Sequence, residues 1–152
     1  MLRDEKRVLV VDDDDAIRAL LFTILRRRGF HVDVARNGVD ALEHCSRCLY
    51  AVVVLDLMMP LMSGWAVLDR LAEMPIDSRP VVLVLTAGLE ARHFDSALVA
   101  ATIRKPFDID LIVEAVTGCI NSRSASDQLD GCPPADSERR PSSSEARPEK
   151  AN

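Results

Sequence analysis

Short runs of Val, Leu, Ile and Ala alternate with segments of helical period, and this alternation constrains the fold of the chain more than any other feature. Apolar runs of this length are typical of strands, and strands separated by helices indicate strand–helix units around a parallel sheet. The run at 51–55 is apolar on both faces, so we expect it at the centre of that sheet. The predicted strands are residues 8–11, 31–35, 51–55, 81–85 and 101–103.

The segments between these runs place apolar residues three and four positions apart, as one buried helix face requires. Gly29 is placed to end the first helix, and Asp108 is placed to cap the last one. The predicted helices are residues 16–28, 39–48, a segment following Gly64, 90–98, and 109 to about 120. The chain is therefore predicted to be an α/β protein with five strands and five helices.

The last part of the chain has a different composition. From about Asn121 it is dominated by Ser, Pro, Arg, Glu and Asp, and it has too few apolar residues to repay the entropy of ordering. We expect one domain over residues 6–120 and a disordered polar tail over residues 121–152. The tail is too short and too polar to form an output domain such as a helix-turn-helix.

Charge and hydropathy exclude several classes of protein. The formal net charge is −5 and no long basic block is present, so direct DNA binding has no electrostatic footprint. The N-terminus is charged up to the first predicted strand, and no apolar stretch approaches the ~20 residues that a membrane span needs. We therefore expect a cytoplasmic protein with no membrane insertion. Cys45 and Cys48 have the spacing of half a zinc site or a redox pair, but no second pair follows at ligand spacing, which favours reduced thiols.

Polar side chains follow four of the five predicted strands. Asp12 and Asp13 come after the first strand, Asp56 after the third, Thr86 after the fourth and Lys105 after the fifth. Each of them alone has an ordinary interpretation as a turn residue or an ion-pair partner. Because the carboxyl ends of parallel strands meet at one edge of a sheet, we expect all of them to form a single site.

This combination of side chains indicates phosphoryl chemistry supported by a divalent cation. Three carboxylates that converge within a few ångströms repel one another unless a cation neutralises them, and oxygen ligands with room for water favour Mg²⁺. With that charge offset, Asp56 is a usable nucleophile toward phosphorus. The Lys105 ammonium and the Thr86 hydroxyl would meet the phosphoryl oxygens.

Over residues 6–120 the chain resembles the receiver domains of bacterial two-component response regulators. The matching motifs are Val10-Val11-Asp12-Asp13, Asp56-Leu57-Met58-Met59-Pro60 with Gly64, Thr86-Ala87, and Lys105-Pro106-Phe107. The resemblance implies a flavodoxin-like, doubly wound five-stranded parallel sheet in the order 2-1-3-4-5, with five helices. It also implies a cis bond between Lys105 and Pro106.

The resemblance further implies a signalling phosphoacceptor rather than an enzyme. A sensor histidine kinase or a histidine phosphotransfer protein would donate the phosphoryl group to Asp56, and phosphorylation would alter docking to an effector protein. Asp13 would bind Mg²⁺ directly, Asp12 would act largely through water, and the backbone carbonyl of Met58 would complete the ligands. Thr86 and Lys105 would contact the phosphoryl group.

The chain departs from the family pattern where the family usually relays the signal. An aromatic residue is usual on the fifth strand, and this chain has Thr102 there. The interval from Thr86 to Lys105 is also shorter than usual. These departures leave open a receiver-like module that binds partners regardless of phosphate.

A second alternative is a Mg²⁺-dependent phosphohydrolase that uses an aspartyl intermediate. Such an enzyme needs a second acid near the nucleophile, and Leu57, Met58 and Met59 provide none.

Overall fold

The computed structural model describes residues 6–59, 61–88 and 97–130, with side chains up to residue 122. Within these ranges five parallel strands form one sheet in the order β2-β1-β3-β4-β5, which confirms the predicted strand order. The strands are β1 (Arg7–Val11), β2 (His31–Ala35), β3 (Val52–Asp56), β4 (Val81–Thr86) and β5 (Val99–Arg104). Each predicted strand is present, with ends that differ by no more than two residues.

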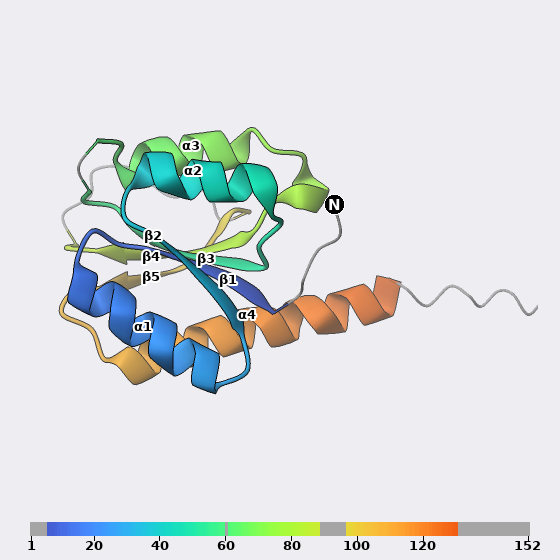
Figure 1. The fold of residues 1–152 in the computed structure, drawn as a ribbon. Coiled ribbons are helices and arrows are strands. Elements are labelled where there is room, and N and C mark those ends of the chain that lie inside the picture. Colours follow the sequence, from blue (N-terminus) through green and yellow to red (C-terminus); the bar gives the residue numbers. More distant parts are fainter. Residues whose placement is uncertain (1–5, 60, 89–96, 131–152) are drawn as a thin grey trace, which may run out of the picture.

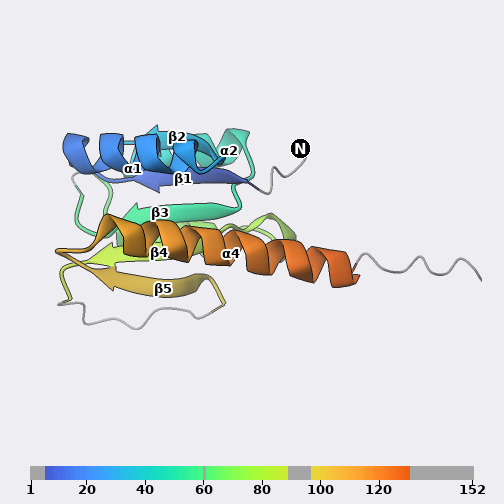
Figure 2. The same ribbon diagram turned by 90° about the horizontal axis from the view of Figure 1, so that it is seen from below.

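Helices cover both faces of this sheet, as Figures 1 and 2 show. The two helices α2 and α3 lie on one face, and α1 and α4 lie on the other. The described helices are α1 (Asp15–Arg27), α2 (Gly38–Arg47), α3 (Gly64–Ala72) and α4 (Ile109–Asp130), with a short 3-10 helix at Ile76–Ser78. In these ranges no helix combines the length and the apolar character that crossing a bilayer requires.

Strand β3 lies at the centre of the sheet, as its two-sided apolar sequence predicts. All five of its residues are buried, and Val54 pairs with Val10 of β1 and Leu83 of β4. Side chains of β3 alternate between two apolar layers, one against α1 and α4 and the other against α2 and α3. The last residue of β3, Asp56, is therefore held at the end of the most buried strand of the sheet.

Each α-helix that follows a strand begins at a side-chain cap. Asp14 accepts hydrogen bonds from the backbone N of Ala16 and Ile17, at 2.9 and 3.1 Å. Asn37 caps α2, Ser63 caps α3, and Asp108 accepts from the backbone N of Asp110 at the start of α4. These caps satisfy backbone N–H groups that have no partner within the helix, so the helices start at defined residues close to the strand ends.

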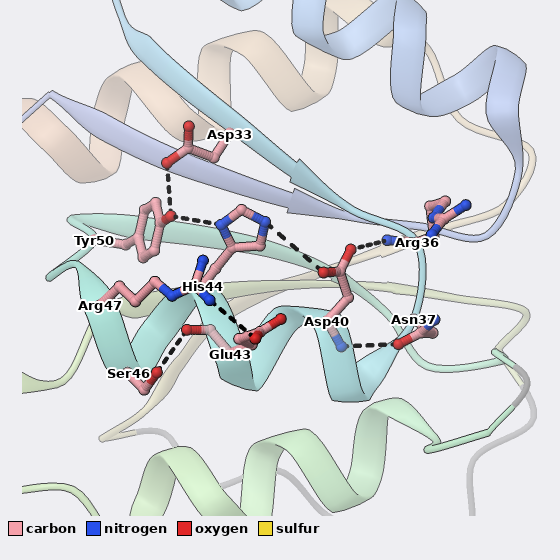
Figure 3. Close-up of polar contacts among 9 residues, drawn as sticks. All are labelled: Asp33, Arg36, Asn37, Asp40, Glu43, His44, Ser46, Arg47 and Tyr50. Atoms are coloured by element: carbon pink, nitrogen blue, oxygen red, sulfur yellow. Dashed lines mark hydrogen bonds and ion pairs between the residues drawn. The ribbon is translucent and has the colours of Figure 1, made fainter.

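A polar network holds α2 against the β2 side of the sheet (Figure 3). The buried hydroxyl of Tyr50 donates to Asp33 Oδ2 of β2 at 2.6 Å and lies 3.4 Å from His44 Nδ1. Burial, and after it the hydrogen bond and charge of Asp33, raise the pKa of Tyr50, so this hydroxyl stays protonated and donates. His44 Nε2 lies 4.0 Å from Asp40 Oδ1, and Asp40 accepts from the backbone N of Arg36. The network thus joins α2 to Asp33 within β2 and to Arg36, which follows β2.

The predicted helix between the fourth and fifth strands cannot be compared with the structure. The predicted helix at 90–98 lies largely on residues 89–96, outside the described residues, and Ala97 and Leu98 form a turn. The structure therefore shows four α-helices in its described ranges rather than five.

The predicted start of the disordered tail at residue 121 is wrong for its first ten residues, because α4 continues to Asp130. These residues include neither Gly nor Pro, and extending an existing helix costs far less than starting one. Gly131 and Pro133, which follow in the sequence, are typical helix-ending residues. Figures 1 and 2 show the last turns of α4 extending beyond the sheet. The proposed disorder of residues 131–152 stays a prediction, because they lie outside the described residues.

The two adjacent leucines Leu20 and Leu21 of α1 provide a test of the core. Leu21 is fully buried, whereas Leu20 is 45% exposed. We expect Leu21→Ala to lower the free energy of unfolding by about 2–5 kcal/mol in urea denaturation, because it leaves a cavity under α1. Leu20→Ala is the matched control and should lower it by less than about 1 kcal/mol. Equal losses for the two variants would contradict the observed orientation of α1.

Candidate functional site

Three aspartates meet at the carboxyl edge of the sheet. Asp12 directly follows β1, and Asp56 ends β3, which lies beside β1. One carboxylate oxygen from each of Asp12, Asp13 and Asp56 lies within 4.8 Å of the others. Asp12 and Asp56 are buried, whereas Asp13 is exposed. The sheet thus brings together the three acids that the sequence predicted to share a site.

Lys105 is the cation of this acidic cluster. It follows β5 and precedes a cis bond to Pro106, as the resemblance implies. Its Nζ lies 3.2 Å from Asp56 Oδ2 and 3.7 Å from Asp12 Oδ2. Its backbone N donates to the carbonyl of Thr86 at 2.8 Å, so the strand end that carries the ammonium is fastened to the end of β4.

The pKa shifts record the competition between burial and charge. Burial, with a further contribution from the Asp56 charge, raises the pKa of Asp12 to about 6, although the hydrogen bond from the backbone N of Asp14 and the Lys105 charge both oppose this. For Lys105, burial lowers the pKa, but Asp12 and then Asp56 overcome that effect and the net pKa is raised. The carboxylates thus keep the ammonium charged, while a single ammonium does not offset the burial of Asp12.

A divalent cation fits the part of the cluster that Lys105 leaves unmatched. Asp12 Oδ2 is buried without a hydrogen-bond partner among the described residues, since the 3.7 Å to Lys105 Nζ exceeds hydrogen-bond length. A buried carboxylate oxygen in that position costs free energy unless a cation meets it. The acidic cluster therefore has the charge and the oxygen donors for a hard divalent ion.

The loop that follows β3 is built against Asp56. Met58 N donates to Asp56 Oδ1 at 3.0 Å, which orients the carboxylate that Lys105 holds through its other oxygen. Gly64 lies so close that a Cβ there would be 2.6 Å from both the Asp56 carbonyl and the Leu57 Cα. The glycine lets α3 begin directly beside the end of β3.

Thr86 and its turn form the remaining side of the site. Thr86 is the last residue of β4 and is 5% exposed. Its Oγ1 accepts a hydrogen bond from the backbone N of Gly88 at 2.9 Å. Strand β4 lies between β3, which ends at Asp56, and β5, which precedes Lys105. Thr86 therefore lies between these two residues along the edge of the sheet.

Two residues that support the cluster were not predicted from the sequence. The backbone N of Asp14 donates to Asp12 Oδ1 at 2.9 Å while the Asp14 side chain caps α1. Arg18 donates to the backbone carbonyl of Asp12 at 2.9 Å and pairs with Asp15. The available signals were the run of four aspartates from Asp12 to Asp15 and the three-residue spacing of Arg18 from Asp15.

The cysteines form no second site in the described ranges. Cys45 and Cys48 are free thiols, and neither belongs to a group of three potential metal ligands there. Burial, with a smaller effect of Cys48, raises the pKa of Cys45 to about 11, which disfavours the reactive thiolate. Both thiols are thus free, and the raised pKa makes Cys45 a poor nucleophile.

Comparison with known proteins identifies the family. The model of the response regulator receiver domain family matches residues 8–117, which is most of the chain. This chain belongs to the response regulator receiver domain family. The sequence of this receiver is 31% identical over 112 residues to the transcriptional regulatory protein DltR of Streptococcus agalactiae, covering 72% of this chain and 50% of DltR. It is 36% identical over 102 residues to the transcriptional regulatory protein SrrA of Staphylococcus aureus, covering 66% of this chain and 42% of SrrA. The receiver thus spans half the length of these relatives or less.

Solved structures show the same relationship. The receiver matches a Francisella response regulator receiver domain with a TM-score of 0.69 and 28% identity, covering 78% of this chain and 98% of that one. It matches the response regulator TrrA of Thermotoga maritima, solved in complex with Mg²⁺ and BeF, with a TM-score of 0.65 and 34% identity, covering 75% of this chain and 98% of that one. The fold described above is therefore that of receiver domains.

Glycine substitutions test the close packing at the Asp56 loop. We expect Gly64→Ala to lower the free energy of unfolding by about 1–3 kcal/mol, because the added methyl group meets backbone atoms that cannot move aside cheaply. Gly118→Ala in α4 is the matched control, since nothing lies within 4 Å of a Cβ there, and it should raise stability by about 0.5–1 kcal/mol. Thermal and urea denaturation measure both. Stabilisation by both substitutions would show that the loop does not need the glycine.

Proposed function

We propose that this receiver is the phosphoacceptor of a two-component or phosphorelay pathway, with Asp56 as the acceptor. The main support for this proposal is the Asp56 carboxylate itself. It is buried at the end of β3, one of its oxygens accepts a hydrogen bond from Met58 N, and the other pairs with Lys105 Nζ. A carboxylate so oriented, beside a cation and two further acids, is arranged to attack phosphorus.

The donor in this proposal is a phosphohistidine on a histidine kinase or a histidine phosphotransfer protein. The Asp56 oxygen forms a bond to phosphorus as the bond from phosphorus to the histidine nitrogen breaks. The histidine leaves with the electron pair and takes up a proton, and Asp56 becomes an aspartyl phosphate. Lys105 and the Thr86 hydroxyl stabilise the charge on the phosphoryl oxygens. The phosphorylated state then alters docking to an effector protein.

Asp12, Asp13, Asp56 and the backbone carbonyl of Met58 would hold Mg²⁺ in this reaction. When bound, the ion supplies positive charge that offsets the acids and the incoming phosphoryl group. The buried Asp12 Oδ2, which has no hydrogen-bond partner among the residues that the structure describes, supports the assignment, as does the similar TrrA structure, which was solved in complex with Mg²⁺ and BeF. Asp13, being exposed, is the acid that incoming ligands reach most easily.

A specific observation favours a second candidate, a receiver that binds partners regardless of phosphate. Thr102 stands where the family usually has an aromatic residue, and it is a small, exposed side chain on β5. It has no ring that could turn inward when Asp56 is modified. The two candidates differ in whether the chemistry of Asp56 changes the state of the protein.

Phosphorylation by acetyl phosphate separates these candidates. With Mg²⁺ present, we expect the wild-type protein to gain the mass of one phosphoryl group in intact-protein mass spectrometry, and Asp56→Asn to gain none, because an amide is a poor nucleophile. Asp110→Asn, at an exposed position in α4, should react like the wild type. Beryllofluoride with Mg²⁺ should likewise change the amide NMR spectrum only where Asp56 is intact. A wild-type protein that neither gains phosphate nor responds to beryllofluoride would exclude the phosphoacceptor function.

Lys105→Met should change metal binding and phosphorylation in opposite directions. The ammonium competes with a divalent ion for Asp12 and Asp56, so its removal should tighten Mg²⁺ binding by about tenfold, or about 1.4 kcal/mol. The same change removes a phosphoryl contact, so the rate with acetyl phosphate should fall by at least about tenfold. Calorimetric Mg²⁺ titration and mass spectrometry give the two values. Lys6→Met is the control, because Lys6 lies just before β1, at the opposite edge of the sheet. If Lys105→Met weakened Mg²⁺ binding as well as slowing phosphorylation, the proposed role of Lys105 would be contradicted.

A further inference from the structure

The turn after β4 connects Thr86 to an exposed arginine. Thr86 Oγ1 accepts from the backbone N of Gly88 at 2.9 Å, so the hydroxyl and the turn hold each other in place. Gly88 has a φ of +87°, a conformation that favours glycine. The position of the Thr86 side chain therefore depends on where the Gly88 peptide lies.

Arg104 occupies the space that a side chain at position 88 would fill. A Cβ on Gly88 would lie 2.2 Å from Arg104 Nε, 2.7 Å from Cζ and 2.8 Å from Nη2. Arg104 is the last residue of β5, pairs with Thr86 in the parallel register and is exposed. Its guanidinium thus packs directly on the backbone of the turn that fixes the Thr86 hydroxyl.

The two contacts link the Thr86 hydroxyl to the surface without using position 102. Movement of the Thr86 hydroxyl toward a group on Asp56 pulls on the Gly88 N–H, and displacement of Gly88 shifts the surface on which the Arg104 guanidinium rests. Lys105, the next residue, keeps its backbone N on the Thr86 carbonyl, so the end of β5 stays attached while the turn moves. The links from Thr86 to Gly88 and from Gly88 to Arg104 are contacts between neighbouring described residues.

We propose that Arg104 is a positioning residue, which restrains the Thr86 hydroxyl through Gly88 and thereby couples the state of Asp56 to an exposed cation on β5. This inference rests on the proposed phosphoacceptor function. It assigns the relay to Arg104 in a chain that has Thr102 in place of the family's usual aromatic residue. In the resting state the guanidinium holds the turn in its observed arrangement, and occupation of the phosphoryl site displaces it.

NMR of the arginine side chain tests the relay directly. In ¹⁵N-labelled protein, the Arg104 Nε–H signal is assigned by its loss in Arg104→Lys, and Mg²⁺ with beryllofluoride is then added. We expect this signal to shift in the wild type together with the amide signals around Asp56, and we expect none of these signals to shift in Asp56→Asn. An Arg104 signal that stays in place while the Asp56 amides move would overturn the relay alone. If no signal depends on Asp56, the proposed function fails first.

The direction of the change in affinity distinguishes restraint from simple charge. Removing the restraint should tighten beryllofluoride binding in Arg104→Met by about fivefold, in line with the loss of one modest contact, because the turn is then displaced more easily. Removing a nearby cation would instead weaken the binding of an anion. Arg104→Lys keeps the charge but lacks the planar guanidinium, so it should resemble Arg104→Met. Arg47→Met, on the exposed surface of α2, is the control. Weaker binding by Arg104→Met, or wild-type binding by Arg104→Lys, would overturn the restraint.

Discussion

The packing of Asp12 beside Asp56 at one end of a parallel sheet is the constraint on which the rest of the site depends. Two buried carboxylates repel each other, and burial penalises the charge of both. Lys105 offsets part of this cost by contacting both acids, which requires β5 to end beside β4. What Lys105 leaves unmatched is the buried Asp12 Oδ2, and this oxygen makes the cluster a candidate site for a divalent cation.

The surrounding loops are built to hold these charges in place. Asp14 and Met58 each donate a backbone N–H to a cluster carboxylate, and Gly64 allows the loop after β3 to pass directly against the end of that strand. The side-chain caps fix where each helix begins, close to the preceding strand, so the loops at this edge of the sheet are constrained at both ends. The sheet therefore positions the acids, and the first turns of the helices orient their oxygens.

The route by which phosphorylation of Asp56 is proposed to reach the surface does not use position 102. Thr102 is exposed and small, whereas Arg104 packs on the turn that holds the Thr86 hydroxyl. A relay through Gly88 needs only a glycine with a positive φ and a planar cation above it. Two cations thus lie at the end of β5 and have different partners. Lys105 contacts Asp12 and Asp56, whereas Arg104 packs on the backbone of Gly88.

Much of the fold followed from local pattern. The strands were predictable because β-branched runs alternate with helical periods, and β3 was predictable as the central strand because both of its faces are apolar. The extension of α4 to Asp130 does not follow from composition, because the residues after 120 are too polar to be buried in a core. An existing helix can nevertheless continue through polar residues where no Gly or Pro interrupts it. The caps at Asp14, Asn37 and Ser63 were readable in principle, since each is a favoured capping residue before a helical segment.

The sequence by itself determined which residues reach the carboxyl edge, because strand polarity and alternation set where each strand ends. It also determined the family, because residues 8–117 match the model of the response regulator receiver domain. Only the tertiary structure decided that Lys105 contacts both acids, that Asp12 Oδ2 has no hydrogen-bond partner in the part of the chain that the structure describes, and that Arg104 lies on Gly88. These features depend on how groups on different strands and turns lie relative to one another. They depend on register, twist and turn conformation, which arise only when the whole sheet is assembled.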